Sequence, residues 1–161
     1  KVQAVITGGG GSLTRIGPGK YIARVNSQTE DCKITVSVDG KVAGASQFRV
    51  RMIPESQAFI GGKASGENFN ASAFTAQGGV GAGIKNFPFE LEYNVQSFTF
   101  TCDTDDDLFS AANQGAAFNN QIRAAMKQHI KAGRTVTIDE IRVKGPDGRT
   151  TTAPSLVYYI K

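Results

Sequence analysis

The chain has 161 residues, enough for one medium-sized domain or two small ones, and its 40% hydrophobic and 20% charged residues argue against an intrinsically disordered protein. The formal net charge is +4, and the basic excess is scattered through residues 1–55 without a run, which argues against nucleic-acid binding. No apolar stretch reaches the roughly 18 residues of a membrane helix.

Short strands separated by turns are predicted for the first third of the chain. Alternating apolar and polar residues place strands at residues 2–6, 21–25, 33–38 and 47–52. Asp39 and Gly40 are typical of a two-residue hairpin turn, and Pro54 ends the last strand because proline lacks the N–H donor of a sheet ladder. This spacing is typical of a β-sandwich, but the strands are too few for a complete one.

The glycine-rich segment GGGGSLTRIGPGKY, residues 8–21, has to be weighed as a phosphate-binding loop. Such a loop needs G-x-x-x-x-G-K-[ST] between a strand and a helix. Here Thr14 stands in place of the first glycine, Tyr21 follows Lys20, and the next predicted element is a strand. The sequence therefore predicts a tight connection between strands, with Leu13 turned inward, and no cofactor site.

The segment from residue 55 onward contains nine of the ten phenylalanines, and its longest predicted strand covers residues 89–102. The apolar residues of that strand change from one parity to the other, which a strand with one buried face can do only by gaining a residue. We therefore predict a β-bulge near Gln96 and Ser97. The same change of parity predicts a second bulge or bend at Asp139 and Glu140.

One helix is clear, near residues 116–132, and Gly133 is expected to end it. Its apolar side follows a 3.6-residue period through Phe118, Ile122, Ala125, Met126 and His129. After the helix, the segment KGPDGRT is predicted to be a turn between two strands, with Pro146 at its second position and Gly148 at positive φ. Residues 156–160 form the last predicted strand.

The fold class that follows is mainly β, with one amphipathic helix and two domains. Residues 1–54 are predicted to be an incomplete β domain, and residues 55–161 a β-rich domain that contains the helix. Cys32 and Cys102 fall in different domains, so we expect two buried, unpaired thiols, with a disulfide in an oxidising compartment as the alternative.

The acidic run CDTDDD invites a calcium interpretation, because Asp103, Asp105 and Asp107 have the spacing of the first three ligands of an EF-hand loop. However, Leu108 stands where that loop needs glycine, and Gln114 where it needs glutamate. We therefore expect an acidic turn and no structural metal, with a weak surface cation site as the alternative. Negative charge just before the helix would also favour the helix N-terminus.

The basic residues Arg123, Lys127 and Lys131 recur at helical spacing opposite the apolar side. The simplest interpretation is a solvated face, and the sharper one is a face that docks onto an acidic partner. His129 is the only histidine, and no serine or cysteine is placed by spacing as its catalytic partner. The sequence thus predicts no catalytic residues and one candidate partner-binding face.

Four segments resemble the C-terminal part of the GldM/PorM family, and they keep its order over nearly the whole chain. They read GGSLTRIGPGKYIARV, FRVRMIPESQAFIGG, AQGGVGAGIKNFPFELEYNVQSFTF and IRVKGPDGRTTTAPSLVYYIK. The most specific parts are the turn at residues 144–149 and the NFPF motif at residues 86–89. Members of this family are periplasmic core proteins of the type IX secretion system and gliding motor of Bacteroidetes.

The resemblance implies that residues 1–54 are a truncated, immunoglobulin-like third periplasmic domain and that residues 55–161 are the complete fourth. Family members have one membrane helix near the N-terminus and four periplasmic domains in an elongated dimer. The chain starts without a methionine, and the strands that open the third domain are absent. We therefore expect Lys1 to lie inside that domain, in a longer protein anchored in the inner membrane and extending into the periplasm.

The resemblance also implies a function without catalysis or cofactors. The membrane helix would contact an inner-membrane partner in a proton-driven motor, and the distal domains would reach an outer-membrane ring lipoprotein and its partner subunit. The chain would then transmit motion as a periplasmic homodimer, and its incomplete sandwich has an open edge suited to strand exchange. The alternative is a generic immunoglobulin-like adhesion or carbohydrate-binding module, which the absence of tryptophan disfavours.

Overall fold

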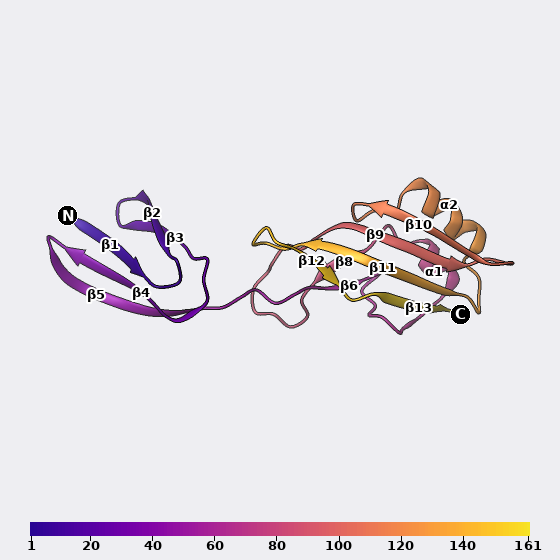
Figure 1. Cartoon of the computed structure of the whole chain (residues 1–161), viewed down its shortest axis with the longest axis horizontal. Coiled ribbons are helices and arrows are strands. Elements are labelled where there is room, and N and C mark those ends of the chain that lie inside the picture. The colour runs from indigo at the N-terminus through magenta and orange to yellow at the C-terminus, as the bar shows by residue number, and fades with distance from the viewer. The chain divides into compact units, whose positions relative to one another are not determined.

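The computed structural model describes residues 1–161 and divides into two compact units, Lys1–Ile53 and Pro54–Lys161. Figure 1 labels nearly all of its elements. Most of the regular structure is β-strand, and only one of the two helices exceeds seven residues. The prediction of a mainly β chain with one clear helix is therefore confirmed.

The first unit contains a three-stranded antiparallel sheet in the order β1-β4-β5 and a separate hairpin, β2-β3. The strands are β1 (Val2–Thr7), β2 (Ser12–Gly17), β3 (Lys20–Arg24), β4 (Thr29–Val38) and β5 (Lys41–Val50). The turn between β4 and β5 has Asp39 at φ 49° and Gly40 at φ 80°, so the predicted hairpin turn is confirmed. Because pairing resumes directly after this turn, β5 begins at Lys41, several residues earlier than predicted.

Residues 8–21 are more than the tight connection that the sequence suggested, because they contain strand β2. The connection itself is shorter: Gly8, Gly9 and Gly10 all have positive φ, and Asn26 donates its N–H to the carbonyl oxygen of Gly9 at 2.9 Å. A Cβ atom at Gly8 would lie 2.6 Å from the carbonyl oxygen of Asp31. The glycines therefore let the chain pass close to β4 before β2 begins.

The second unit is built on a sheet in the order β10-β9-β11-β13-β7, with β12 also paired to β11. All neighbours are antiparallel except β13 and β7. A small sheet of β6 and β8 accompanies it. The elements are β6 (Gln57–Phe59), β7 (Asn68–Phe69), α1 (Ala71–Thr75), β8 (Gly81–Gly83), β9 (Asn94–Asp103), β10 (Leu108–Gln114), α2 (Asn120–His129), β11 (Thr135–Lys144), β12 (Thr150–Ala153) and β13 (Leu156–Ile160).

Both predicted bulges are present, and they lie in the same ladder between β9 and β11. Asp139 pairs with Thr99 and Arg142 with Ser97, so β11 has one extra residue there, and Glu140 has φ 52°. Val143 then pairs with Val95, which leaves Gln96 as the extra residue of β9. The extra residues allow both strands to keep their apolar side chains on the buried face on either side of the bulges.

The long strand begins later than predicted, at Asn94 and not at residue 89. Asn86 has φ 57°, and Pro88 cannot donate to a ladder, so the backbone of the NFPF motif leaves the sheet. Phe89 is 70% exposed, and its ring makes an edge contact with Phe87 at a centroid distance of 5.9 Å. Phe89 therefore lies on the surface, although the sequence pattern placed it in a strand.

The helix α2 is shorter than the predicted range of 116–132. The side chain of Asn119 accepts the N–H of Ile122 at 2.8 Å and caps the N-terminus, so Phe118 packs in the core from outside the helix. Ile130 is extended and ends the helix three residues before Gly133, which has φ 88° in the turn that leads to β11. The predicted stop at Gly133 is therefore a turn residue beyond the helix end.

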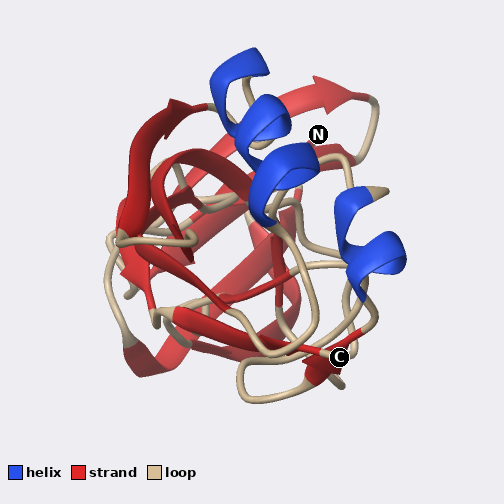
Figure 2. Ribbon diagram, turned by 90° about the vertical axis from the view of Figure 1, so that its right-hand side faces the viewer, coloured by secondary structure: helices blue, strands red, loops and turns tan.

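The core of the second unit lies between the large sheet and the two helices, which lie beside each other in Figure 2. Phe69, Phe74 and Tyr158 form a cluster of edge-to-face and tilted rings with centroid distances of 5.2 to 6.1 Å. The short helix α1, which the sequence did not predict, contributes Phe74. Nearly all buried apolar side chains belong to this unit, and Cys32 is the only one in the first unit.

The turn after β11 has the predicted geometry. Gly148 has φ 81° and donates its N–H to the carbonyl oxygen of Gly145 at 3.0 Å, with Pro146 at the second position.

The two cysteines are buried, free thiols, one in each unit. Burial raises the pKa of the Cys102 thiol to about 11.

Candidate partner-binding face

The three basic residues of the candidate face differ in the polar contacts that their side chains make within the chain. Lys127 is in the last turn of α2, is exposed, and takes part in no ion pair. Lys131 lies beyond the end of the helix, and its ammonium group is 3.8 Å from the carboxylate of Asp105. Lys131 therefore continues the predicted series of basic residues without being part of the helix.

Arg123 is held by the backbone of its own unit. Its Nε donates to the carbonyl oxygen of Phe118 at 2.9 Å, and its Nη2 donates to that of Gly78 at 3.4 Å. These bonds satisfy carbonyl groups that precede the helix, so the guanidinium group links the helix start to the loop before β8. Lys127 is therefore the one member of the face whose side chain makes no polar contact within the chain.

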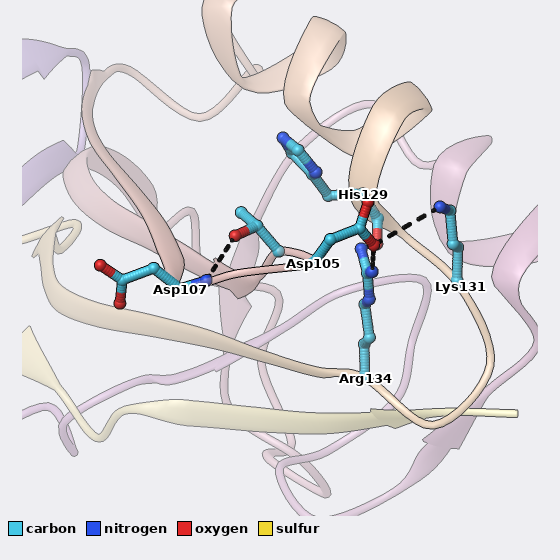
Figure 3. Close-up of polar contacts among 6 residues, drawn as sticks. Asp105, Asp107, His129, Lys131 and Arg134 are labelled. Atoms are coloured by element: carbon cyan, nitrogen blue, oxygen red, sulfur yellow. Dashed lines mark hydrogen bonds and ion pairs between the residues drawn. The ribbon is translucent and has the colours of Figure 1, made fainter.

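The sequence suggested that the acidic run lies at the helix N-terminus, but the structure places it elsewhere. It forms the turn between β9 and β10, and Asp105 lies next to the C-terminal end of α2 (Figure 3). A helix C-terminus carries a partial negative charge, so it repels a nearby carboxylate unless a cation lies between the carboxylate and the helix end. Arg134 supplies that cation.

Arg134 bridges the helix end and the acidic turn. Its Nη1 donates to the carbonyl oxygen of His129 at 2.8 Å, and its Nη2 donates to the carboxylate of Asp105 (Figure 3). Only 15% of the Arg134 side chain is exposed. The hydrogen bond from Arg134, followed by the charge of Lys131, holds the pKa of Asp105 below its ordinary value.

Asp103 and Asp107, the other two aspartates weighed as calcium ligands, make different contacts. The Asp103 carboxylate accepts the N–H of Thr135 at 2.9 Å, and the N–H of Asp107 is donated to the hydroxyl of Thr104 at 3.0 Å. No group of three or more histidine, cysteine, aspartate or glutamate side chains is arranged to hold a metal ion. The structure therefore does not bring Asp103, Asp105 and Asp107 together around one point.

His129 packs as part of the helix. Its half-buried ring stacks on Phe109 at a centroid distance of 6.4 Å and an interplanar angle of 28°. Its backbone carbonyl oxygen, not its ring, takes part in the bridge to Arg134. The structure places His129 as a boundary residue between the core and the surface.

Arg134 is the residue of this site that the sequence did not identify. It follows the helix and precedes a strand, so neither helical spacing nor strand alternation marks it. The available signal was the cluster of acidic residues in the turn, which attracts a basic side chain from elsewhere in the fold. What the arrangement offers chemically is a charged surface with one free ammonium group, at Lys127.

No helix of the structure has the length and apolar character needed to cross a membrane.

The family model of the GldM third domain matches residues 1–51, and that of the GldM C-terminal domain matches residues 31–161. No curated protein matches the chain.

Among solved structures, InvD from Yersinia pseudotuberculosis is 14% identical, and the alignment covers 97% of this chain and 56% of that one. Its TM-score of 0.23 is too low to indicate a shared fold. The chain spans little more than half the length of that structure. The two family models match the chain in order, overlap over residues 31–51, and together cover every residue. The chain therefore belongs to the GldM family, whose members are components of the type IX secretion and gliding-motility machinery.

Proposed function

We propose that this chain is a structural, non-enzymatic part of a subunit that couples an inner-membrane, proton-driven motor to an outer-membrane ring. The observation that carries the proposal is the order of the two family matches, third domain followed by C-terminal domain, over the whole chain. The C-terminal domains of this family are periplasmic. We assign the chain to the periplasm, as the distal part of a protein anchored in the inner membrane.

The surface that we assign to ring binding is the basic face of α2 together with the exposed loops of the second unit. Lys127 supports this assignment, because its ammonium group is exposed and has no partner within the chain. Arg123 and Lys131 are less available to a partner, since backbone carbonyl oxygens hold the Arg123 guanidinium group and Lys131 pairs with Asp105. An acidic patch on the ring lipoprotein or its partner subunit would complement Lys127.

The test is a pull-down of the purified ring lipoprotein and its partner subunit with the folded chain. Lys127→Glu should weaken binding, whereas Lys20→Glu, at the tip of the β2-β3 hairpin, is the matched control and should bind like the wild type. A folded chain that binds neither protein would contradict the partner assignment. Equal binding by Lys127→Glu and wild type would contradict only the role of the helix face.

We also propose that the chain acts as a homodimer with the first unit at the interface. Strand β5 pairs with β4 along one edge only, and nearly all of its side chains are exposed. Val42 is 70% and Phe48 is 50% exposed, which is unusual for apolar side chains of a ten-residue strand. Multi-angle light scattering should give the mass of a dimer, and a stable monomer would contradict strand exchange without affecting the family assignment.

A further inference from the structure

Strand β10, Leu108–Gln114, forms an outer edge of the large sheet and pairs with β9 alone. The other outer edges are β7, which has two residues, and β12, which has four. The β7 edge is partly covered, because the ammonium group of Lys63 donates to the carbonyl oxygen of Asn68 at 3.0 Å. The edges of this sheet are therefore not equivalent, and β10 is the longest one.

The ladder between β9 and β10 determines which backbone groups of β10 point outward. At the two ends of an unbroken register, the N–H of Thr104 donates to the carbonyl oxygen of Asp107, and the N–H of Gly115 donates to that of Gln96. Hydrogen-bonded pairs alternate in an antiparallel ladder, so Phe109, Ala111 and Asn113 direct their backbone groups to β9. The backbone groups of Leu108, Ser110, Ala112 and Gln114 consequently point away from the sheet.

Only one end of this edge is closed. The side chain of Asn119 donates to the carbonyl oxygen of Ala112 at 3.2 Å, and that of Asn113 donates to the carbonyl oxygen of Gln114 at 3.3 Å. Leu108 and Ser110 have no partner for their N–H or C=O groups. A stretch of free donors and acceptors therefore remains between the acidic turn and Ala112.

The side chains do not protect this edge. Exposed edges in natural sheets are usually blunted by a charged residue, a proline or a bulge. The sequence LFSAANQ of β10 has no charge and no proline, and its register with β9 has no shift. Leu108 is 60% exposed on the open face of the sheet.

Charge lies at the open end of the strand. Asp106 and Asp107 are exposed, and neither takes part in an ion pair, whereas Asp105 is bound by Arg134 and Lys131. Figure 3 shows the Asp107 carboxylate directed away from that cluster. Two carboxylates without an ion-pair partner therefore directly precede Leu108 in the chain.

We propose that β10 binds an extended peptide segment of a partner protein as an added strand. Backbone hydrogen bonds to Leu108 and Ser110 would hold the segment, and a lysine or arginine of the segment would lie against Asp106 and Asp107. Side chains of alternate peptide residues would pack beside Leu108 on the open face of the sheet. This site is separate from the Lys127 face and does not rest on the proposed function.

The experiment uses a displayed library of random twelve-residue peptides, selected on the immobilised 161-residue chain. We expect enriched peptides to combine β-branched or aromatic residues with a lysine or arginine near one end. Ser110→Pro removes an outward N–H without removing a bond to β9 and should lower peptide affinity about tenfold. Ser110→Thr keeps the N–H and is the matched control, with affinity close to that of the wild type.

The charged end is tested with Asp106→Asn combined with Asp107→Asn, which should weaken binding of the basic peptides, with a smaller effect at high salt. Amide hydrogen exchange on the wild-type chain tests the edge even if Ser110→Pro does not fold. A bound peptide should slow exchange at Leu108 and Ser110 and leave Val157, on β13, unchanged. Enrichment of acidic peptides, equal binding to Ser110→Pro, or no protection at Leu108 and Ser110 would overturn the proposal.

Discussion

Tyr158 accepts the backbone N–H of Ile60 at 3.0 Å, across 98 residues of sequence. The same hydroxyl donates to the carbonyl oxygen of Lys63 at 2.7 Å, so one buried side chain satisfies both ends of the loop after β6. Tyr158→Phe should therefore lower the free energy of unfolding by about 1 kcal/mol, because only the longer bond from the Ile60 N–H to the Lys63 carbonyl oxygen, at 3.4 Å, then remains for these two groups. Chemical denaturation of the two proteins measures this difference.

Tyr159→Phe is the control for that substitution. Tyr159 is the next residue of β13, is 48% exposed, and its hydroxyl makes no hydrogen bond within the chain. Its loss should change the stability by less than about 0.5 kcal/mol. Similar losses for the two variants would show that the Tyr158 hydroxyl does not hold the loop.

The stability that depends on Tyr158 should disappear at alkaline pH. Burial raises the pKa of Tyr158 from 10.0 to about 12, so the folded state favours the protonated hydroxyl. Its contribution is complete below pH 10 and is lost as the pH rises through 12. The difference in unfolding free energy between the wild type and Tyr158→Phe should therefore shrink over this range, and a constant difference would contradict the assignment.

Glu140 should respond to substitution in the reverse of the normal order for a strand. Glycine in a strand is usually less stable than alanine, but at φ 52° a Cβ atom costs about 1 kcal/mol. Both substitutions remove the hydrogen bond from the Thr99 hydroxyl to Glu140. Glu140→Gly should thus be more stable than Glu140→Ala by about 1 kcal/mol, and the opposite order would rule out a strained bulge residue.

Arg134→Ala should destabilise the second unit by about 1–2 kcal/mol, because the carbonyl oxygen of His129 loses its charged donor at the helix end. The pKa of Asp105, followed by NMR, should rise in this variant, since the Arg134 hydrogen bond is the main cause of its low value. Lys131→Ala provides the comparison and should raise that pKa by less. An unchanged pKa of Asp105 in Arg134→Ala would exclude the bridge.

The two units should differ sharply when each is expressed alone. Residues 54–161 contain a contiguous apolar core, whereas the first unit buries only Cys32 among its apolar side chains. Small domains depend on buried apolar area for their stability. Calorimetry should show a cooperative transition for the fragment 54–161 and none for the fragment 1–53. A cooperative transition of the short fragment as a monomer would contradict this expectation.

Sequence patterns predicted those parts of the fold in which one local rule acts alone. Asp39 and Gly40 define their hairpin turn by backbone preference, and the parity changes around Gln96 and Glu140 require extra residues because one face of each strand is buried. The same reasoning failed at Phe89. There the alternation continued, but Asn86 and Pro88 take the backbone out of the sheet, and a pattern of side chains does not include that effect.

The candidate site could be predicted only in part, because charges become a site through long-range pairing. Helical spacing identified Arg123 and Lys127, but nothing local indicated that the Arg123 guanidinium group binds backbone carbonyls. The acidic turn was assigned to the wrong end of the helix, since sequence order places it before α2 while the hairpin β9-β10 returns it to the C-terminal end. Which strand forms an open edge also follows only from the complete strand order.

The two bulges between β9 and β11 have opposite effects on the register. The extra residue of β11 moves the pairing by one position, and the extra residue of β9 moves it back, so only the Arg142–Ser97 pair is offset. The two bulges therefore match each other in only one register of the strands. Sliding one strand along the other by a single residue would separate the paired irregularities and turn Ile141 and Val143 away from the core. A sheet joined in this way resists slippage under a pull along its strands.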